Sequence, residues 1–252
     1  MKKITVAGLY FFFTLIVMLF TGCRKLVDRI FYERLEDRHC KIVQFKQNLG
    51  FGDDAVRTGP VYYNDREDPD SVMFDIETGS AGAAYFVFTY DKNGQLIEYR
   101  ADYSRQADDY LTKHHYKYKN GLVVTDTTWA RQSGSGIIVY TLHYDRRGRI
   151  IKEDGHMIEL DGQPADIELD PIIYTYDDAG NLNSNRIEYD EEVSFLRTNE
   201  VWMFTQRNYS RNNPVGATSY NQFDLPLGFP NDGGISFLGF TGPQEIVYDC
   251  AK

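Results

Sequence analysis

Residues 142–150 read Leu-His-Tyr-Asp-Arg-Arg-Gly-Arg-Ile, and they carry every signal of a β-hairpin. Apolar and aromatic residues at alternate positions predict a strand that ends at Tyr144. The Asp145 carboxylate can accept hydrogen bonds from the backbone of the next residues, which starts a type I turn. Gly148 can adopt the left-handed conformation that closes a three-residue loop, and Ile150 then begins the returning strand.

Three further copies of this pattern lie on either side. Two residues in each copy are expected to form its turn: Asp91 and Gly94, Asn120 and Gly121, Asp145 and Gly148, and Asp177 and Gly180. The four glycines are 27, 27 and 32 residues apart. About 27 residues hold two strands of about ten residues and two turns, so the chain predicts a series of hairpins. Two decayed copies are expected, at Tyr209 with Asn212 and Asn213, and at Tyr220-Asn221 with Leu225-Pro226.

The alternation also predicts two unlike faces. After Gly94, Tyr99 and Ala101 share one face, whereas Glu98 and Arg100 share the other. An antiparallel sheet that is wet on one side has this pattern, and its apolar face must be covered. We therefore expect an all-β fold, an antiparallel meander of hairpins that forms a strongly twisted, curled sheet or an open barrel.

The first residues carry a secretory pattern. Two lysines follow Met1, and residues 4–20 form an apolar run. The sequence Thr21-Gly22-Cys23 resembles the lipobox of bacterial lipoproteins, in which cleavage precedes a lipidated Cys. The resemblance implies a signal peptide over residues 1–22 and a lipid on Cys23. The alternative is a plain transmembrane anchor, for which the run is short.

The rest of the chain is expected to form one domain. The spacing of Leu26, Ile30 and Leu35 predicts a short amphipathic helix within residues 23–39, before a single β domain over residues 40–252. Residues 211–243 contain four of the eight prolines and several apolar side chains, which predicts an ordered loop cap.

Cys40 and Cys250 stand near the two ends of this domain. Disulfides persist in the oxidising compartment to which a secretory signal leads, so we expect the two residues to be paired. Two separate buried thiols are the alternative.

The repeated Tyr-Asp pair with its following Gly resembles the YD-repeat family. The resemblance covers roughly residues 85–185, and more weakly extends to about residue 225. The chain has too few copies for the hollow shell of the large YD-repeat proteins. It is more similar to the small YD-repeat lipoproteins of bacterial envelopes.

Composition and motifs restrict the function. The 252 residues carry a formal net charge of −10, which argues against nucleic acid as a partner. No GxSxG, Walker, GxGxxG or HExxH motif is present, so the sequence indicates no catalytic residue, no cofactor and no metal site. An enzyme, such as a hydrolase, is the least favoured class.

Aromatic residues are the candidate binding groups. Tyr99, Tyr116, Trp129 and Tyr140 are candidates for a stacking platform, although packing within the hairpins is the favoured role. A partner protein is a candidate for the apolar residues of the loop cap, Phe229, Phe237 and Phe240.

Together these features favour a membrane-anchored envelope lipoprotein that acts as a non-catalytic binding or scaffold module for a protein partner or a glycan. The alternative is a carrier of a lipid or peptide in a curled aromatic groove. We expect an outer-membrane location, and a periplasm-facing position is preferred because Arg24-Lys25 lack the acidic residues of some surface-export signals.

Overall fold

The computed structural model describes seven segments that all belong to one compact unit, Cys40–Lys252. They are residues 40–48, 56–74, 85–102, 110–131, 135–183, 187–230 and 236–250. The expected signal peptide, the lipidation site Cys23 and the helix expected within residues 23–39 lie outside them. No helix among the described residues is long and apolar enough to cross a membrane.

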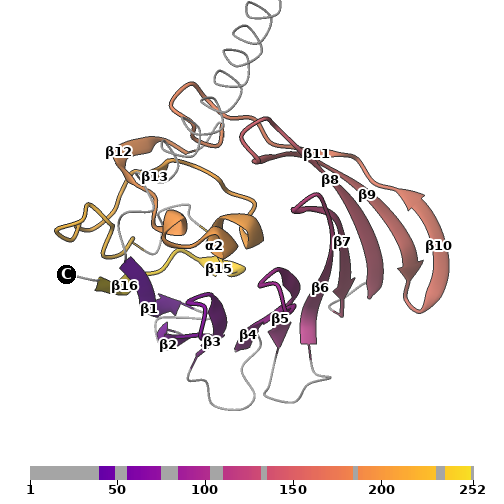
Figure 1. The fold of residues 1–252 in the computed structure, drawn as a ribbon, viewed down its shortest axis with the longest axis horizontal. Helices are drawn as coiled ribbons and strands as arrows, with labels where there is room; N and C mark the ends of the chain where they lie inside the picture. Colours follow the sequence, from indigo (N-terminus) through magenta and orange to yellow (C-terminus); the bar gives the residue numbers. More distant parts are fainter. Residues whose placement is uncertain are drawn as a thin grey trace, which may run out of the picture. The chain divides into compact units, whose positions relative to one another are not determined.

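A twelve-stranded antiparallel meander forms most of this unit (Figure 1). Its strands are β1 (Cys40–Asn48), β2 (Val56–Tyr63), β3 (Pro69–Met73), β4 (Tyr85–Tyr90), β5 (Leu96–Asp102), β6 (Tyr110–Lys119), β7 (Leu122–Ala130), β8 (Gly136–Tyr144), β9 (Ile150–Leu160), β10 (Gln163–Glu168), β11 (Ile172–Ile173) and β16 (Glu245–Cys250). Strands β1 to β10 are neighbours in chain order, β16 pairs with β1, and β11 pairs with β9 beside β10. The sheet curls but does not close, so the all-β meander is confirmed in its curled, open form.

Shorter elements lie on the concave side of the sheet (Figure 1). They are β12 (Tyr189–Val193), the 3₁₀ helix η2 (Phe195–Thr198), the helix α2 (Glu200–Thr205), β13 (Asn212–Pro214), β14 (Ser236–Phe237) and β15 (Phe240–Thr241). Helix α2 begins after Asn199, whose side chain accepts a hydrogen bond from the Val201 backbone as an N-cap.

One turn geometry, here called the Tyr-Asx turn, recurs along the chain. A tyrosine precedes an Asp or Asn, and that residue's side-chain oxygen accepts a hydrogen bond from the backbone N–H four residues on, at 2.8–3.1 Å. Two backbone hydrogen bonds close the same loop. It occurs at residues 64–68, 91–95, 145–149, 177–181 and 221–225. Asn120 and Gly121 instead both have positive φ, as a two-residue type I′ hairpin requires.

Two of these turns lack the glycine on which the sequence pattern relies. Glu67 and Asp224 hold the left-handed position at φ 67° and φ 60°. The turn at Asn64 was not expected from the sequence, whereas the decayed copy expected at Asn221 is present. The decayed copy expected at Tyr209 is wrong, because Asn212 and Asn213 belong to strand β13.

In three of the five Tyr-Asx turns, the tyrosine links one hairpin to the preceding hairpin. The hydroxyl donates to a backbone carbonyl at the start of the returning strand there, and Tyr118 before the two-residue turn does the same. The donors and acceptors are Tyr90 and Pro69 (2.7 Å), Tyr118 and Leu96 (2.9 Å), Tyr144 and Val123 (2.8 Å), and Tyr176 and Ile150 (3.2 Å). These hydroxyls therefore satisfy carbonyls near the turns and fix neighbouring hairpins to each other. Tyr63 instead donates to the Ile42 carbonyl within β1, and Tyr220 donates to the Asp190 carboxylate.

The hydrophobic core lies between the concave face and these shorter elements. Trp202 of α2 is fully buried, and its ring meets those of Phe45 and Phe88 edge-on, at centroid distances of 6.1 and 5.5 Å. Edge-to-face packing at such distances is a favoured aromatic geometry. A six-residue helix is too short to be stable alone, so this packing holds α2 in place.

Cys40 and Cys250 form the predicted disulfide. They lie directly opposite each other in the register of β1 and β16, with Cα atoms 4.0 Å apart. The bond closes a loop of 210 residues, which the chain-entropy model values at about 5 kcal/mol.

We predict that Gly148→Val destabilises the fold, because Gly148 has φ 77°. A Cβ atom there would meet nothing within 4 Å, so backbone strain accounts for the effect, about 1–2 kcal/mol. A drop in the thermal midpoint of about 2–8 °C should follow in calorimetry. Gly148→Asn should lose less, since Asn tolerates this conformation. An unchanged midpoint in the Val variant would show that the turn assignment is wrong.

Candidate functional site

The candidate site lies where α2 meets the concave face of the sheet. The helix ends in a Schellman motif, in which Arg207 N–H donates to the Phe204 carbonyl and Asn208 N–H donates to that of Met203. Arg207 occupies the left-handed position of this motif, φ 52°, where glycine is usual. A non-glycine residue in this strained conformation indicates that its side chain has a specific role. The contacts of the Arg207 side chain show what that role is.

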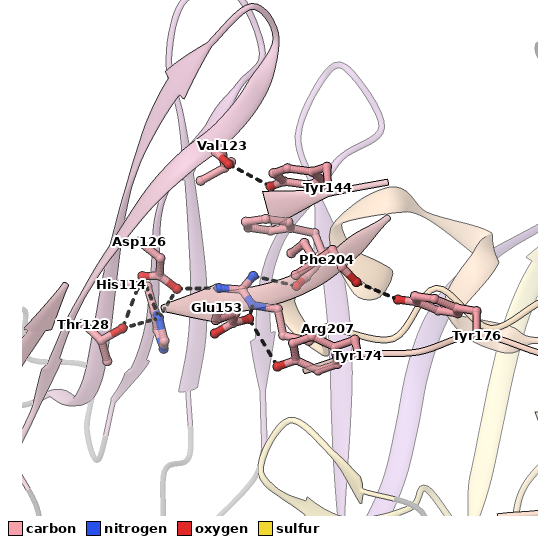
Figure 2. A network of polar contacts seen from close by, with 11 residues as sticks. His114, Val123, Asp126, Thr128, Tyr144, Glu153, Tyr174, Tyr176, Phe204 and Arg207 are labelled. Atoms are coloured by element: carbon pink, nitrogen blue, oxygen red, sulfur yellow. Dashed lines mark hydrogen bonds and ion pairs between the residues drawn. The ribbon is translucent and has the colours of Figure 1, made fainter. Parts of the chain in front are cut away.

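Arg207 joins the helix to two buried carboxylates of the sheet (Figure 2). Its Nη2 donates to Asp126 of β7 and its Nε donates to Glu153 of β9, the latter at 2.7 Å. The side chains of Asp126 and Glu153 are only 1% and 6% exposed. Nη1 also donates to the Phe204 carbonyl at 2.8 Å. One guanidinium therefore satisfies two buried carboxylates and one carbonyl at the end of α2.

The same network contains a histidine and a threonine, but their geometry is not that of a catalytic triad. His114 Nδ1 lies 3.0 Å from an Asp126 oxygen and 3.1 Å from Thr128 Oγ1 (Figure 2). A relay needs the acid on one ring nitrogen and the nucleophile on the other. Here both groups approach Nδ1, and Thr128 Oγ1 also contacts Asp126 at 3.2 Å. The arrangement fits a structural polar network.

Asp126 titrates abnormally for clear physical reasons. Burial on its own raises its pKa, but the charge of His114 and the hydrogen bond from it, followed by the charge of Arg207, outweigh burial. The pKa of Asp126 is therefore lowered from its ordinary value of 3.8. The carboxylate is ionised in the folded protein at neutral pH, as an ion pair with Arg207 requires.

A pocket of about 240 Å³ lies beside this network, at four successive hairpin turns. Its residues come from those turns and from α2 with the loop after it: Asp68, Tyr90, Gly94, Gln95, Leu96, Tyr118, Gly121, Leu122, Val123, Tyr144, Gly148, Glu200, Val201, Phe204 and Tyr209. Arg207 lies over the Phe204 ring, 4.5 Å from its centroid. The ion-pair network therefore supports the wall of the pocket.

A second feature is a line of apolar side chains on the concave face near the free edge of the sheet, here called the apolar row. Residues directly opposite in register share a face, which places Ile138, Met157 and Ile167 together, and Ile172 on the same face beside Glu153. Ile167 and Ile172 are each 44% exposed. These two isoleucines on adjacent elements leave apolar surface that another molecule could cover.

The candidate platform is divided between the two faces of the sheet. Tyr99 and Tyr116 are buried on the concave face, where Tyr116 meets the Phe204 ring at 5.0 Å. Tyr140 lies opposite Asp126 and shares that face. Trp129, an odd number of residues from Asp126, lies on the convex face with the Lys113 ammonium 4.6 Å from its ring centroid. The four rings do not form one platform.

The apolar residues of the loop cap lie mainly inside the core. Phe229 and Phe237 are 1% and 0% exposed, and Phe237 packs on Phe45 at a centroid distance of 4.7 Å. The side chain of Phe240 lies outside the described residues. The two placed rings therefore contribute to stability and offer no surface to a partner.

Sequence reasoning missed the two residues that organise the site, Trp202 and Arg207. One signal was available, because Asn199 followed by Glu200 and a mainly apolar run is a helix N-cap pattern. Arg207 had no local signal, since its partners Asp126 and Glu153 are 81 and 54 residues away.

Comparison with protein-family models finds no match, and comparison with curated proteins finds none either. Within the part of the chain that the structure describes, no three His, Cys, Asp or Glu side chains are grouped as metal ligands.

We predict that Arg207→Met strongly destabilises the fold. It would leave the Asp126 and Glu153 carboxylates buried without their cation, which costs about 3–5 kcal/mol. Urea unfolding would measure the loss. Arg146→Met, at an exposed turn position, is the matched control and should change stability by less than about 0.5 kcal/mol. Equal midpoints for the two variants would contradict the role given to Arg207.

Asp126 also predicts a pH dependence. Its pKa is lower in the folded than in the unfolded chain, so the unfolded chain binds more protons between the two values. The resulting stabilisation is complete above the ordinary pKa and is lost as pH falls through the folded value. Urea midpoints from about pH 2 to pH 7 should therefore decline less in acid for Asp126→Asn than for the parent. Asp178→Asn, at an exposed position, should keep the parent profile. An unchanged acid decline in Asp126→Asn would contradict this assignment.

Proposed function

We propose that the chain is a non-catalytic binding module of the bacterial cell envelope, which a lipid on Cys23 anchors to the outer membrane, facing the periplasm. Its partner is another envelope protein, which binds at the apolar row. The signal-like N-terminus and the resemblance to small YD-repeat lipoproteins support the anchor and the compartment. Acyl chains contribute about 0.8 kcal/mol per buried CH₂, enough for stable anchoring.

The apolar row is the observation that carries the choice of a protein partner. A protein surface can cover Ile167 and Ile172, and completing their burial would contribute about 1 kcal/mol for each. A glycan would need exposed aromatic rings instead. Tyr99 and Tyr116 are buried, and Trp129 already carries the Lys113 ammonium over its ring.

The carrier alternative has less support in the geometry. A lipid or peptide carrier needs an open apolar groove along the concave face. Trp202 and Phe237 fill that face near β1 and β4, where their rings pack against Phe45 and Phe88. The space beside α2 measures only about 240 Å³, less than most sites for drug-sized ligands.

We predict that Ile167→Lys abolishes partner binding, because it places a charge in the middle of the apolar row. The lipidated protein would be extracted from its own membrane in mild detergent and examined by native mass spectrometry. The parent should carry a stoichiometric protein partner, and Ile167→Lys should not.

Ile173→Lys is the matched control, since Ile173 is 58% exposed and its neighbour Ile172 lies on the concave face. It should retain the partner. A parent protein that carries a lipid or a glycan, or no partner at all, would overturn the proposal. Retention of the partner by Ile167→Lys would place the interface elsewhere.

A further inference from the structure

We propose that the pocket at the hairpin turns is a second binding site, specific for an alkylammonium group. The group could belong to a free amine or to a lysine side chain. The site lies among Tyr90, Tyr118 and Tyr144 on the sheet side and Phe204 and Glu200 on the α2 side, and is distinct from the apolar row.

The charges that line the pocket have one sign. Asp68 and Glu200 contribute carboxylates, and no Lys, Arg or His is among the described residues that line it. Both charges act on a tyrosine of the pocket. Burial raises the pKa of Tyr90, and the negative charges of Asp68 and Glu200 raise it further. Burial and then the charge of Glu200 raise the pKa of Tyr118 to about 12. The charge of Arg207 acts in the opposite direction on two other tyrosines of the pocket. Burial raises the pKa of Tyr144 and of Tyr209, whereas the positive charge of Arg207 lowers it. The carboxylates therefore favour a cation on the side of the pocket formed by Tyr90 and Tyr118.

The hydrogen-bonding capacity of the pocket is also one-sided. Tyr90, Tyr118 and Tyr144 donate their hydroxyl protons to backbone carbonyls, so these oxygens can only accept from a ligand. Gln95 and Tyr209 supply the side-chain donors. A sugar presents donors and acceptors alike, whereas an ammonium presents donors alone, which matches a wall rich in acceptors.

Ring surface and size narrow the ligand further. Aromatic residues attract cations through the negative faces of their rings, and five aromatic residues line this pocket. Arg207 already lies over the Phe204 ring, which leaves the four tyrosine rings of the pocket for a ligand cation. A volume of about 240 Å³ suits a short amine or the end of a lysine side chain. The Arg66 guanidinium lies against Gly94 at the edge of the pocket, where it donates to the Lys92 carbonyl at 2.6 Å.

The test compares three probes of equal chain length on the full lipidated protein in detergent: n-butylammonium, 1-butanol and butyrate. Chemical-shift titration of the tyrosine rings would measure the dissociation constants. Butylammonium should bind at least about ten-fold more tightly than butanol, and butyrate should not bind. If the amine and the alcohol bound equally tightly, or if none of the three probes bound, the proposal would be overturned. This result would come from the parent protein alone.

Variants then locate the site. Glu200→Gln and Asp68→Asn should each weaken butylammonium about three- to five-fold, as partly exposed ion pairs do, and Asp178→Asn should not. If only Asp178→Asn lost the preference for butylammonium over butanol, the binding site would lie elsewhere. Thermal midpoints of the variants separate misfolding from lost binding.

The two sources of the amine differ in a second measurement. If the partner's lysine fills the pocket, butylammonium should release the partner protein during native mass spectrometry. If a free amine fills it, the parent should carry a small bound mass, and Glu200→Gln should carry that mass at lower occupancy. Either result agrees with the proposal. The comparison of the three probes decides whether the proposal is correct, and its outcome does not depend on whether the apolar row binds a partner.

Discussion

The hydrogen bond from a turn tyrosine to a carbonyl of the preceding hairpin is the constraint on which this fold depends. A meander joined by backbone ladders alone could twist or flatten between hairpins. The side-chain bonds of Tyr90, Tyr118, Tyr144 and Tyr176 add a second connection between successive hairpins, at the end where the turns lie. Because three of these rings also line the pocket, the repeat that builds the sheet also builds the wall of a candidate site.

A curled sheet of this kind has a concave apolar face that other elements must cover. Arg207 determines where helix α2 lies on that face. Placing an arginine at a left-handed position has a conformational cost, and burying three charges costs more. Their mutual hydrogen bonds offset that cost only while α2 stays at one position on the sheet. The network therefore fixes the helix against β7 and β9, and among the described residues the apolar row near the edge stays partly exposed.

The sequence predicted what local chemistry determines. Asp145 and Gly148 specify a turn within five residues, so the hairpins, the meander and the unlike faces were predictable. The Asn64 turn was not, because Glu67 takes the left-handed conformation without the glycine that marks it. The candidate site depended on contacts across more than 50 residues, which no local pattern encodes. Aromatic composition predicted binding groups, yet Phe229 and Phe237 pack inside, since sequence shows that a residue is apolar but not which surface it covers.

The disulfide has a mechanical consequence. Cys40 and Cys250 are the first and last described positions of the sheet and are covalently joined across β1 and β16. A pull applied to the chain ends passes through this bond and bypasses the strands enclosed by its 210-residue loop. Strand hydrogen bonds, which yield one after another under tension, carry load only after the sulfur bridge is reduced. A pull on the two chain ends would therefore not unravel the domain while the Cys40–Cys250 bond is intact.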